Sequence, residues 1–377
     1  MAGSQDAEPE LAATAGFAER LLELIDSGRR TATYKLALVM ALIDLCARRS
    51  DAAGRPPSVL YTREIAEQVA ALYWPQVMVY RRGPEAIQLR QITLPRSAIT
   101  GAVLDFRRVA EANGVTSLGL ARHRLAGEYS QMLDRVEVAL AEQPLPRLQI
   151  VGSGEQTLPF LYDIGWGPRE SFSRRRLHRD DPAGLPVRLR PGAGDQLVRL
   201  APLILPLVEL HWTRMVATIN GVATEEQQLH RHLFGRDRLT PPKALRQGLA
   251  DLQASRCFYC HKPFREAPEA DHFIPRVRCG IDAVENLVLA DNRCNNDKSD
   301  RLPAAPLVDA WAGRNLDHED TLAQLAIASG WDSDAPGTMA VARSIYRHLP
   351  PGLTAFWHGA GRVDITHVRP GIVIETL

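Results

Sequence analysis

"EADHFIPRVRCGIDAVENLVLADNRCNNDKSD", residues Glu269–Asp300, gathers reactive side chains that the rest of the chain keeps apart. An Asp-His pair, a single Asn, a Cys and a double Asn all fall within this one stretch. Elsewhere, Leu, Ala and Arg recur at the spacing of amphipathic helices. The stretch therefore raises the question of which chemistry requires these side chains close together.

Local patterns inside the stretch predict two strands and a short helix. In "EADHFIP", the apolar run after His272 predicts a strand that presents Asp271 and His272 near its start. "ENLVLA" predicts a second strand that begins at Asn286, and "DNRCNNDKSD" predicts a helix that carries Asn295 and Lys298. The expected order is strand, loop, strand and helix, which makes a small α+β element.

The cysteines cluster around the same stretch. Four of the five are Cys257, Cys260, Cys279 and Cys294, and the fifth is Cys46. An odd number with this clustering argues against a secreted disulfide framework and for metal ligation in a reducing compartment. The spacing in "CFYC" lets the thiolates of Cys257 and Cys260 reach one tetrahedral Zn²⁺ from a tight turn.

A zinc site needs two more ligands. Cys294 is the evident third ligand, and Asp291 stands where a second Cys-x-x-Cys would place its first cysteine. Cys279 or His261 could serve in place of Asp291. Alternatively, the zinc site is degraded and Asp291 is an ordinary surface residue. The sequence thus predicts a structural Zn²⁺ and leaves its fourth ligand open.

The order CxxC, DHxxP, a single Asn and CNxxK resembles the HNH endonuclease family. The resemblance covers Cys257–Pro303 and leaves the rest of the chain outside it. It implies a ββα-metal domain stapled by zinc. Asp291 departs from the family pattern, because many members have a Cys at that position.

The resemblance also implies roles for individual residues. Asp271 corresponds to the carboxylate that holds a divalent cation, and His272 corresponds to the general base. Asn286 corresponds to the residue that ties the loop to the strand and helps to orient the histidine. Asn295, directly after Cys294, corresponds to the second ligand of the cation. The implied catalytic set is Asp271, His272, Asn286 and Asn295.

Phosphodiester hydrolysis accounts for these residue types. A neutral imidazole can accept a proton from water, and a hard cation such as Mg²⁺ prefers oxygen ligands from a carboxylate and an amide. Mn²⁺ or Ni²⁺ could take the same place. Lys298, Arg276 and Arg278 are candidate nucleic-acid contacts. Lys298 could instead support the fold, and the two arginines could equally be solvated.

Overall composition limits the remaining possibilities. The chain has 377 residues, which predicts two or three domains, and a net charge of +1, which gives no global attraction for nucleic acid. The N-terminus has no signal-peptide pattern, and the most apolar stretches, Leu36–Leu45 and Leu200–Val208, are too short to span a membrane. We therefore expect a soluble, cytoplasmic protein with no membrane partner.

The organisation of the chain is predicted to be mainly α with the small α+β element near its C-terminal end. Residues 1–245 are expected to form a mainly helical recognition or partner region. Its short strands are expected in "PRLQIVG", "TLPFLYDIG" and "PVRLRPG". Residues 250–304 form the expected HNH nuclease domain, and residues 305–377 a helical C-terminal extension.

The predicted function is a metal-dependent HNH endonuclease that acts on DNA, preferably double-stranded. A chain that joins an HNH unit to a large unrelated segment is similar in its organisation to bacterial restriction or phage-defence nucleases. A protein or small-molecule regulator could bind the N-terminal region. The alternative is a zinc-stabilised nucleic-acid-binding or assembly module without nuclease activity.

Overall fold

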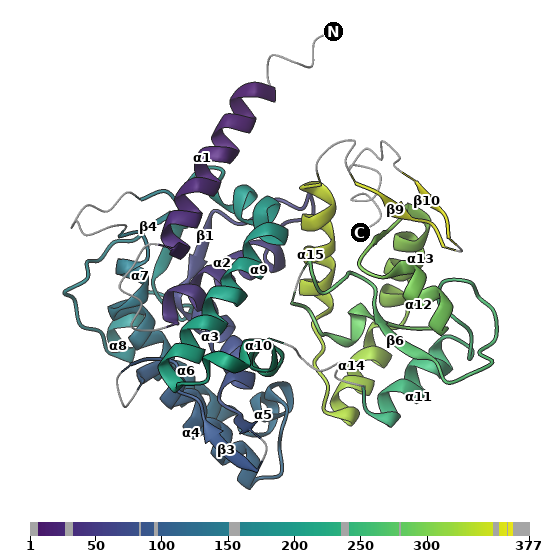
Figure 1. The fold of residues 1–377 in the computed structure, drawn as a ribbon, viewed down its shortest axis with the longest axis horizontal. Coiled ribbons are helices and arrows are strands. Elements are labelled where there is room, and N and C mark those ends of the chain that lie inside the picture. The colour runs from purple at the N-terminus through teal and green to yellow at the C-terminus, as the bar shows by residue number, and fades with distance from the viewer. Residues whose placement is uncertain are drawn as a thin grey trace. The chain divides into compact units, whose positions relative to one another are not determined.

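The computed structural model describes residues 7–26, 33–82, 84–93, 97–150, 159–234, 241–278, 280–349, 354–359 and 361–364. The chain divides into two compact units (Figure 1). Unit 1 comprises Met1–Leu45, Pro57–Leu118 and Leu125–Arg238, and unit 2 comprises Cys46–Pro56, Gly119–Arg124 and Leu239–Leu377. The HNH-like segment and the helices that follow it therefore share one unit.

Helices dominate the first two thirds of the chain. They are α1 (Ala7–Asp26), α2 (Tyr34–Arg48), α3 (Thr62–Gln76), α4 (Ala98–Ala112), α5 (Leu118–Arg124), α6 (Ala126–Glu142), α7 (Pro144–Arg147), α8 (Arg174–Leu177), α9 (Ala193–Asn220) and α10 (Glu226–Leu233). Helix α6 packs against α3 and α4, and it buries Met132, Leu133, Val136 and Leu140 at helical spacing. The long helix α9 is capped at its C-terminal end by Gly221, whose φ of 69° suits a residue without a side chain.

Short strands accompany these helices. Antiparallel β1 (Val59–Tyr61), β5 (Pro186–Leu189) and β4 (Tyr162–Asp163) form one sheet, and β2 (Val79–Arg82) pairs with β3 (Glu85–Gln88). The strands predicted in "TLPFLYDIG" and "PVRLRPG" are present as β4 and β5. The strand predicted in "PRLQIVG" does not begin at Pro146, because Pro146 and Arg147 belong to the helical turn α7, Leu148 and Gln149 form a turn, and Ile150 makes only an isolated bridge; residues 151 and 152 lie outside the described residues.

A buried carboxylate links three parts of unit 1. Glu137 on α6 has no exposed surface. Its oxygens accept hydrogen bonds from the Thr62 hydroxyl at 2.5 Å and from Arg63 at 3.3 Å, and lie 2.9 Å from His178 Nε2. Asp134 pairs with Arg63 as well, at 2.8 Å. Although Asp134, Glu137 and His178 are close enough to share a metal ion, the Arg63 guanidinium already supplies the positive charge.

Replacement of Glu137 by Ala should destabilise unit 1 by about 1–3 kcal/mol, because the buried Thr62 hydroxyl and His178 lose their acceptor while Arg63 keeps Asp134. Hydrogen exchange of the α3 and α6 amides in the full chain measures this loss. Gln131→Ala, at an exposed position of the same helix, serves as the control and should change the opening free energy by less than about 0.5 kcal/mol. Equal protection in the two variants would show that the network contributes nothing.

Unit 2 is built from helices around two small sheets. Its elements include α11 (Lys243–Leu252), β6 (Glu269–His272), β7 (Leu287–Ala290), α12 (Asn292–Lys298), β8 (Leu302–Pro303), α13 (Ala305–Asp317), α14 (Glu319–Ser329), α15 (Ala335–Arg347), β9 (Phe356–Trp357) and β10 (Val363–Asp364). β6 and β7 are antiparallel, with Asp271 opposite Val288 and His272 opposite Leu287. The prediction of a mainly α chain with a small α+β element is confirmed, including the order strand, loop, strand and helix.

The position of the first strand differs from the prediction. β6 ends at His272 instead of starting there, and the apolar Phe273 and Ile274 follow it in a bend. Both side chains are buried, so the apolar run reflects burial after the strand rather than the strand itself. Asp271 and His272 therefore lie at the end of β6, where the loop begins.

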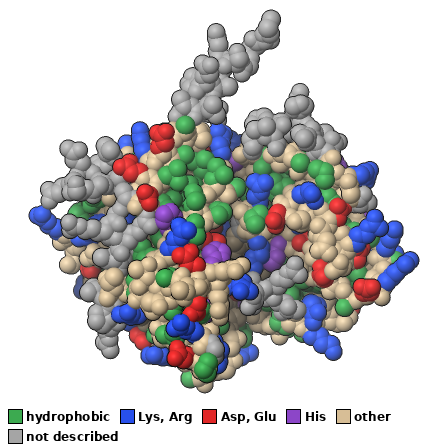
Figure 2. Space-filling view, viewed as in Figure 1, with side chains coloured by type: hydrophobic (Ala, Val, Ile, Leu, Met, Phe, Trp, Pro, Cys, Tyr) green, Lys and Arg blue, Asp and Glu red, His purple; other side chains and the backbone are tan. Residues whose placement is uncertain are grey.

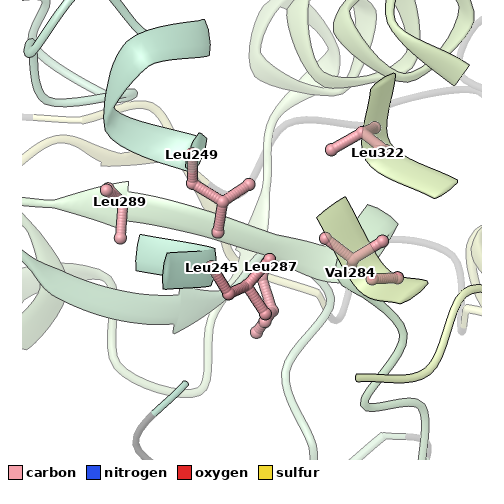
Figure 3. Close-up of a cluster of buried hydrophobic side chains, with 7 residues drawn as sticks. Leu245, Leu249, Val284, Leu287, Leu289 and Leu322 are labelled. Atoms are coloured by element: carbon pink, nitrogen blue, oxygen red, sulfur yellow. The ribbon is translucent and has the colours of Figure 1, made fainter. Parts of the chain in front are cut away.

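The core of unit 2 lies behind the β6–β7 hairpin. Figure 3 shows Leu287 and Leu289 of β7 with Leu245 and Leu249 of α11 and Leu322 of α14. Val284 and Ala326 belong to the same cluster. Leu287 and Leu289 are two residues apart and share one face of the strand. This packing fixes the hairpin, and therefore the place of the residues at its end.

Charge is distributed evenly over the visible surface. In the face shown in Figure 2, basic and acidic side chains are interspersed rather than gathered by sign. Among the described residues, no helix combines the length and the apolar character needed to cross a bilayer.

Candidate functional site

Three thiols and one carboxylate meet where the CxxC turn approaches the start of α12. The turn is closed by hydrogen bonds from the Cys257 amide to the Lys262 carbonyl and from the His261 amide to the Cys257 carbonyl, both 2.9 Å. His261 adopts a φ of 58°, in the left-handed region. Cys257, Cys260, Asp291 and Cys294 place their ligand atoms within 4.8 Å of one another. The predicted four-residue set is thus brought together.

Asp291 has two contacts that suit a dual role. Its Oδ1 accepts the Cys294 amide at 2.8 Å and caps α12, while its Oδ2 accepts from the Cys260 thiol at 3.1 Å. The second oxygen can therefore bind a metal without loss of the helix cap. Of the other two candidate ligands, His261 is exposed and outside this group, and Cys279 lies outside the described residues.

The electrostatics of the cluster favour a cation. Burial raises the pKa of the Cys257 and Cys294 thiols, and neighbouring thiols add to the effect at Cys294. Burial also opposes ionisation of Asp291, but hydrogen bonds led by the Cys294 amide outweigh it and lower the pKa of that carboxyl. Three thiols and a carboxylate fit the donor preferences of zinc. Binding would release thiol protons and add its free energy to folding.

On the other side of α12, a buried lysine connects the helix to β6. The Lys298 ammonium is 3.0 Å from Asp271 Oδ2 and donates to the His272 carbonyl at 2.8 Å. Tyr259 donates its hydroxyl hydrogen to the same Asp271 oxygen. Lys298 has no exposed surface, so it supports the fold rather than contacts a phosphate. Burial lowers the pKa of this lysine, and Asp271 partly offsets that effect.

Asn295 on α12 is oriented by a carboxylate on β6, the strand that carries Asp271. Its Nδ2 donates to Glu269 Oε2 at 2.5 Å, and Asn292 donates to the other Glu269 oxygen at 2.8 Å. Because the amide nitrogen is committed to Glu269, the amide oxygen is the atom that Asn295 can offer to a cation. Glu269 and Asp271 are two residues apart on β6 and reach α12 at Asn295 and Lys298. We call this junction the β6–α12 seam.

His272 has a separate partner in the loop between the strands. Its Nε2 lies 2.9 Å from Asp282 Oδ1, and the same oxygen is 3.4 Å from Arg276 Nε. The described contacts do not join Asp271, His272 and Asn295 directly to one another. The structure therefore places the two candidate ligands at the seam and the candidate base at the adjoining end of β6.

Asn286 binds the two ends of the loop. Its Oδ1 accepts the Ile274 amide at 2.8 Å, and its Nδ2 donates to the carbonyls of Ile274 and Ile281 at 3.0 and 3.1 Å. The side chain is completely buried, which leaves it no access to a substrate. These contacts suit the loop-tying role that the family resemblance implies. Arg276 and Arg278 lie within the loop that Asn286 closes, and both are partly exposed.

Sequence reasoning missed three residues with direct contacts in the site: Tyr259, Glu269 and Asp282. The strand periodicity offered a signal for Glu269, because residues two apart on a strand share one face and Glu269 is two residues before Asp271. Tyr259 stands inside the CxxC turn, but nothing in that motif indicates where its hydroxyl points. Asp282 sits in a loop of irregular conformation, where no spacing rule connects it with His272.

Comparison with known proteins agrees with this site. Residues 257–301 match the HNH endonuclease family, so unit 2 carries a nuclease-type domain that implies divalent-metal and nucleic-acid binding. Residues 14–233, more than half of the chain, match the domain of unknown function DUF8808. The chain belongs to the DUF8808 family. No curated protein and no solved structure matches it significantly.

Loss of a cysteine ligand should destabilise the HNH-like domain more than loss of the candidate base. We expect Cys257→Ser to lower the melting temperature of the full chain by several degrees more than His272→Ala, because metal binding is coupled to folding. Chelation with a strong zinc chelator should reproduce the Cys257→Ser effect in the wild type and have little further effect in the variant. Equal melting temperatures in the two variants, with less than one zinc equivalent by elemental analysis, would exclude a structural zinc.

Proposed function

We propose that this protein is a metal-dependent endonuclease that hydrolyses DNA phosphodiester bonds at the end of β6. The observation that carries the proposal is the position of His272, Asp271 and Asn295 within the segment that matches the HNH endonucleases. A base and two oxygen ligands for a cation are the groups that such a reaction needs.

The residues at the site divide the chemistry among them. His272 accepts a proton from the attacking water, a contribution worth about 10²–10⁴-fold in rate. Asp271 and Asn295 would hold Mg²⁺ or a related ion such as Mn²⁺ or Ni²⁺. Such an ion, when bound, would stabilise the negative charge on the phosphate and on the leaving oxygen. Both ligands have an oxygen suited to this task, since Lys298 and Tyr259 contact Asp271 only through Oδ2.

The neighbouring residues hold these groups in place. Lys298 binds the Asp271 carboxylate and the His272 carbonyl together, which fixes the end of the strand. Glu269 orients the Asn295 amide. The zinc cluster of Cys257, Cys260, Asp291 and Cys294 anchors the other end of α12. The site therefore consists of a small reacting set inside a larger supporting network.

The remaining features of the proposal concern the protein as a whole. Three functional parts are expected: residues 1–245 for recognition, residues 250–304 for cleavage and residues 305–377 as an extension. The DUF8808 part would recognise a DNA feature, a protein or a small-molecule regulator. Double-stranded DNA is the favoured substrate, and bacterial restriction or phage defence in the cytoplasm is the favoured setting.

One observation favours a second candidate function. The ion pair between Asp271 and the fully buried Lys298 gives Asp271 a structural role that does not require catalysis. An HNH-like domain with only this task would act as a zinc-stabilised DNA-binding or assembly module. It would bind DNA but leave it intact.

Cleavage of plasmid, linear and single-stranded DNA in Mg²⁺ or Mn²⁺ separates the two functions. We expect metal-dependent cutting by the wild type and a loss of about 10²–10⁴-fold in His272→Ala, with unchanged DNA affinity. His123→Ala, at an exposed position of α5, serves as the matched control and should cut at the wild-type rate. Metal-independent or absent cleavage by the wild type on every DNA form would refute the nuclease function and favour the binding module.

A further inference from the structure

The partner of the candidate base is a loop carboxylate outside the family motif described above. Asp282 Oδ1 lies 2.9 Å from His272 Nε2, within hydrogen-bonding distance. Both side chains are largely sheltered, with 14% of Asp282 and 23% of His272 exposed. The pair is therefore a directed contact and not a chance approach of two solvated groups.

The loop around Asp282 is fixed on both sides. The Asp282 carbonyl accepts the indole hydrogen of Trp331 at 2.6 Å. The preceding carbonyl, that of Ile281, accepts from the buried Asn286 amide at 3.1 Å, and the Val284 amide donates to the Asp332 carbonyl at 2.9 Å. These bonds set the position of the carboxylate before any substrate arrives.

An arginine also limits the rotation of the carboxylate. Arg276 Nε lies 3.4 Å from the oxygen that faces His272. Arg276 belongs to the same loop, so its contact with Asp282 and the Asn286 bonds brace the loop together. The predicted nucleic-acid contact Arg276 thus has a defined position beside the pair.

In a neutral imidazole, the contact with Asp282 determines which ring nitrogen of His272 carries the hydrogen. One ring nitrogen carries the hydrogen and the other carries the lone pair, and a carboxylate stabilises the tautomer that donates to it. A carboxylate at Nε2 therefore keeps the hydrogen on Nε2 and leaves the lone pair on Nδ1. A fixed tautomer and ring orientation are what a general base needs.

We propose that Asp282 is a positioning residue that holds His272 as the Nε2–H tautomer, so that Nδ1 is the atom that takes the proton from water. The catalytic consequence rests on the proposed nuclease function. The water O–H bond breaks, its hydrogen moves to Nδ1, and the oxygen uses the remaining electron pair to form a bond to phosphorus. The P–O bond to the leaving sugar oxygen breaks, and that oxygen keeps the bonding pair and takes up a proton from solvent. The resulting imidazolium is stabilised by the Asp282 carboxylate at Nε2.

The tautomer can be measured without DNA and without cleavage. In full-length protein labelled with ¹⁵N-histidine, long-range ¹H–¹⁵N correlation spectra distinguish the two neutral forms, and the signals missing in His272→Ala identify residue 272. We expect the Nε2–H pattern for His272 in the wild type and a mixed or Nδ1–H pattern in Asp282→Asn. Asp309→Asn, at an exposed position of α13, should leave the wild-type pattern. An Nδ1–H pattern in the wild type, or identical patterns in wild type and Asp282→Asn, would overturn the proposal.

Kinetics then test the catalytic consequence. Asp282→Asn should lower kcat for DNA cleavage by about 10–100-fold, the usual effect of a residue that orients another, with KM and melting temperature close to wild type. A fall in melting temperature with unchanged kcat would show that Asp282 has only a structural role. Failure of the wild type to cleave DNA, together with the Nε2–H pattern, would contradict the nuclease function and still support the orientation of His272 by Asp282.

Discussion

The buried ion pair between Lys298 and Asp271 is the constraint on which the candidate site depends. An ammonium without exposed surface is tolerated only with a compensating charge, and Asp271 lies 3.0 Å from it. Because Lys298 also donates to the His272 carbonyl, one side chain sets the distance between α12 and the end of β6. The pair thus couples the stability of the domain to the geometry of the groups assigned to catalysis.

Two supporting networks extend from this pair without overlapping. On one side of α12, Cys257, Cys260, Asp291 and Cys294 hold the start of the helix and provide a donor set for zinc. In the loop, Asn286 closes the segment that contains Arg276 and Asp282. The cluster of cysteines and Asp291 therefore holds the start of the helix, and Asn286 holds the loop that follows β6.

The sequence predicts the parts of this site better than their contacts. The order of strand, loop, strand and helix followed from residue types and spacing, and so did the grouping of Cys257, Cys260 and Cys294. The spacing left the fourth member open, and the structure places Asp291 there. The start of the first strand was misplaced, because Phe273 and Ile274 are apolar for burial after the strand has ended. Asp282 could not be foreseen, because loop conformation decides which side chain reaches His272. In unit 1, the Glu137 network escaped prediction for the same reason, since its partners come from distant segments.

Diffraction from crystals of the wild-type protein grown with Mn²⁺ and a short DNA duplex is the most direct test of the central assignment, that Asp271 and Asn295 share one cation. We expect an anomalous scattering peak bound by oxygen atoms of both residues and by a phosphate oxygen, with Lys298 still paired to Asp271. A peak bound elsewhere, or a seam in which the two side chains face different sides and share no ion, would contradict the assignment.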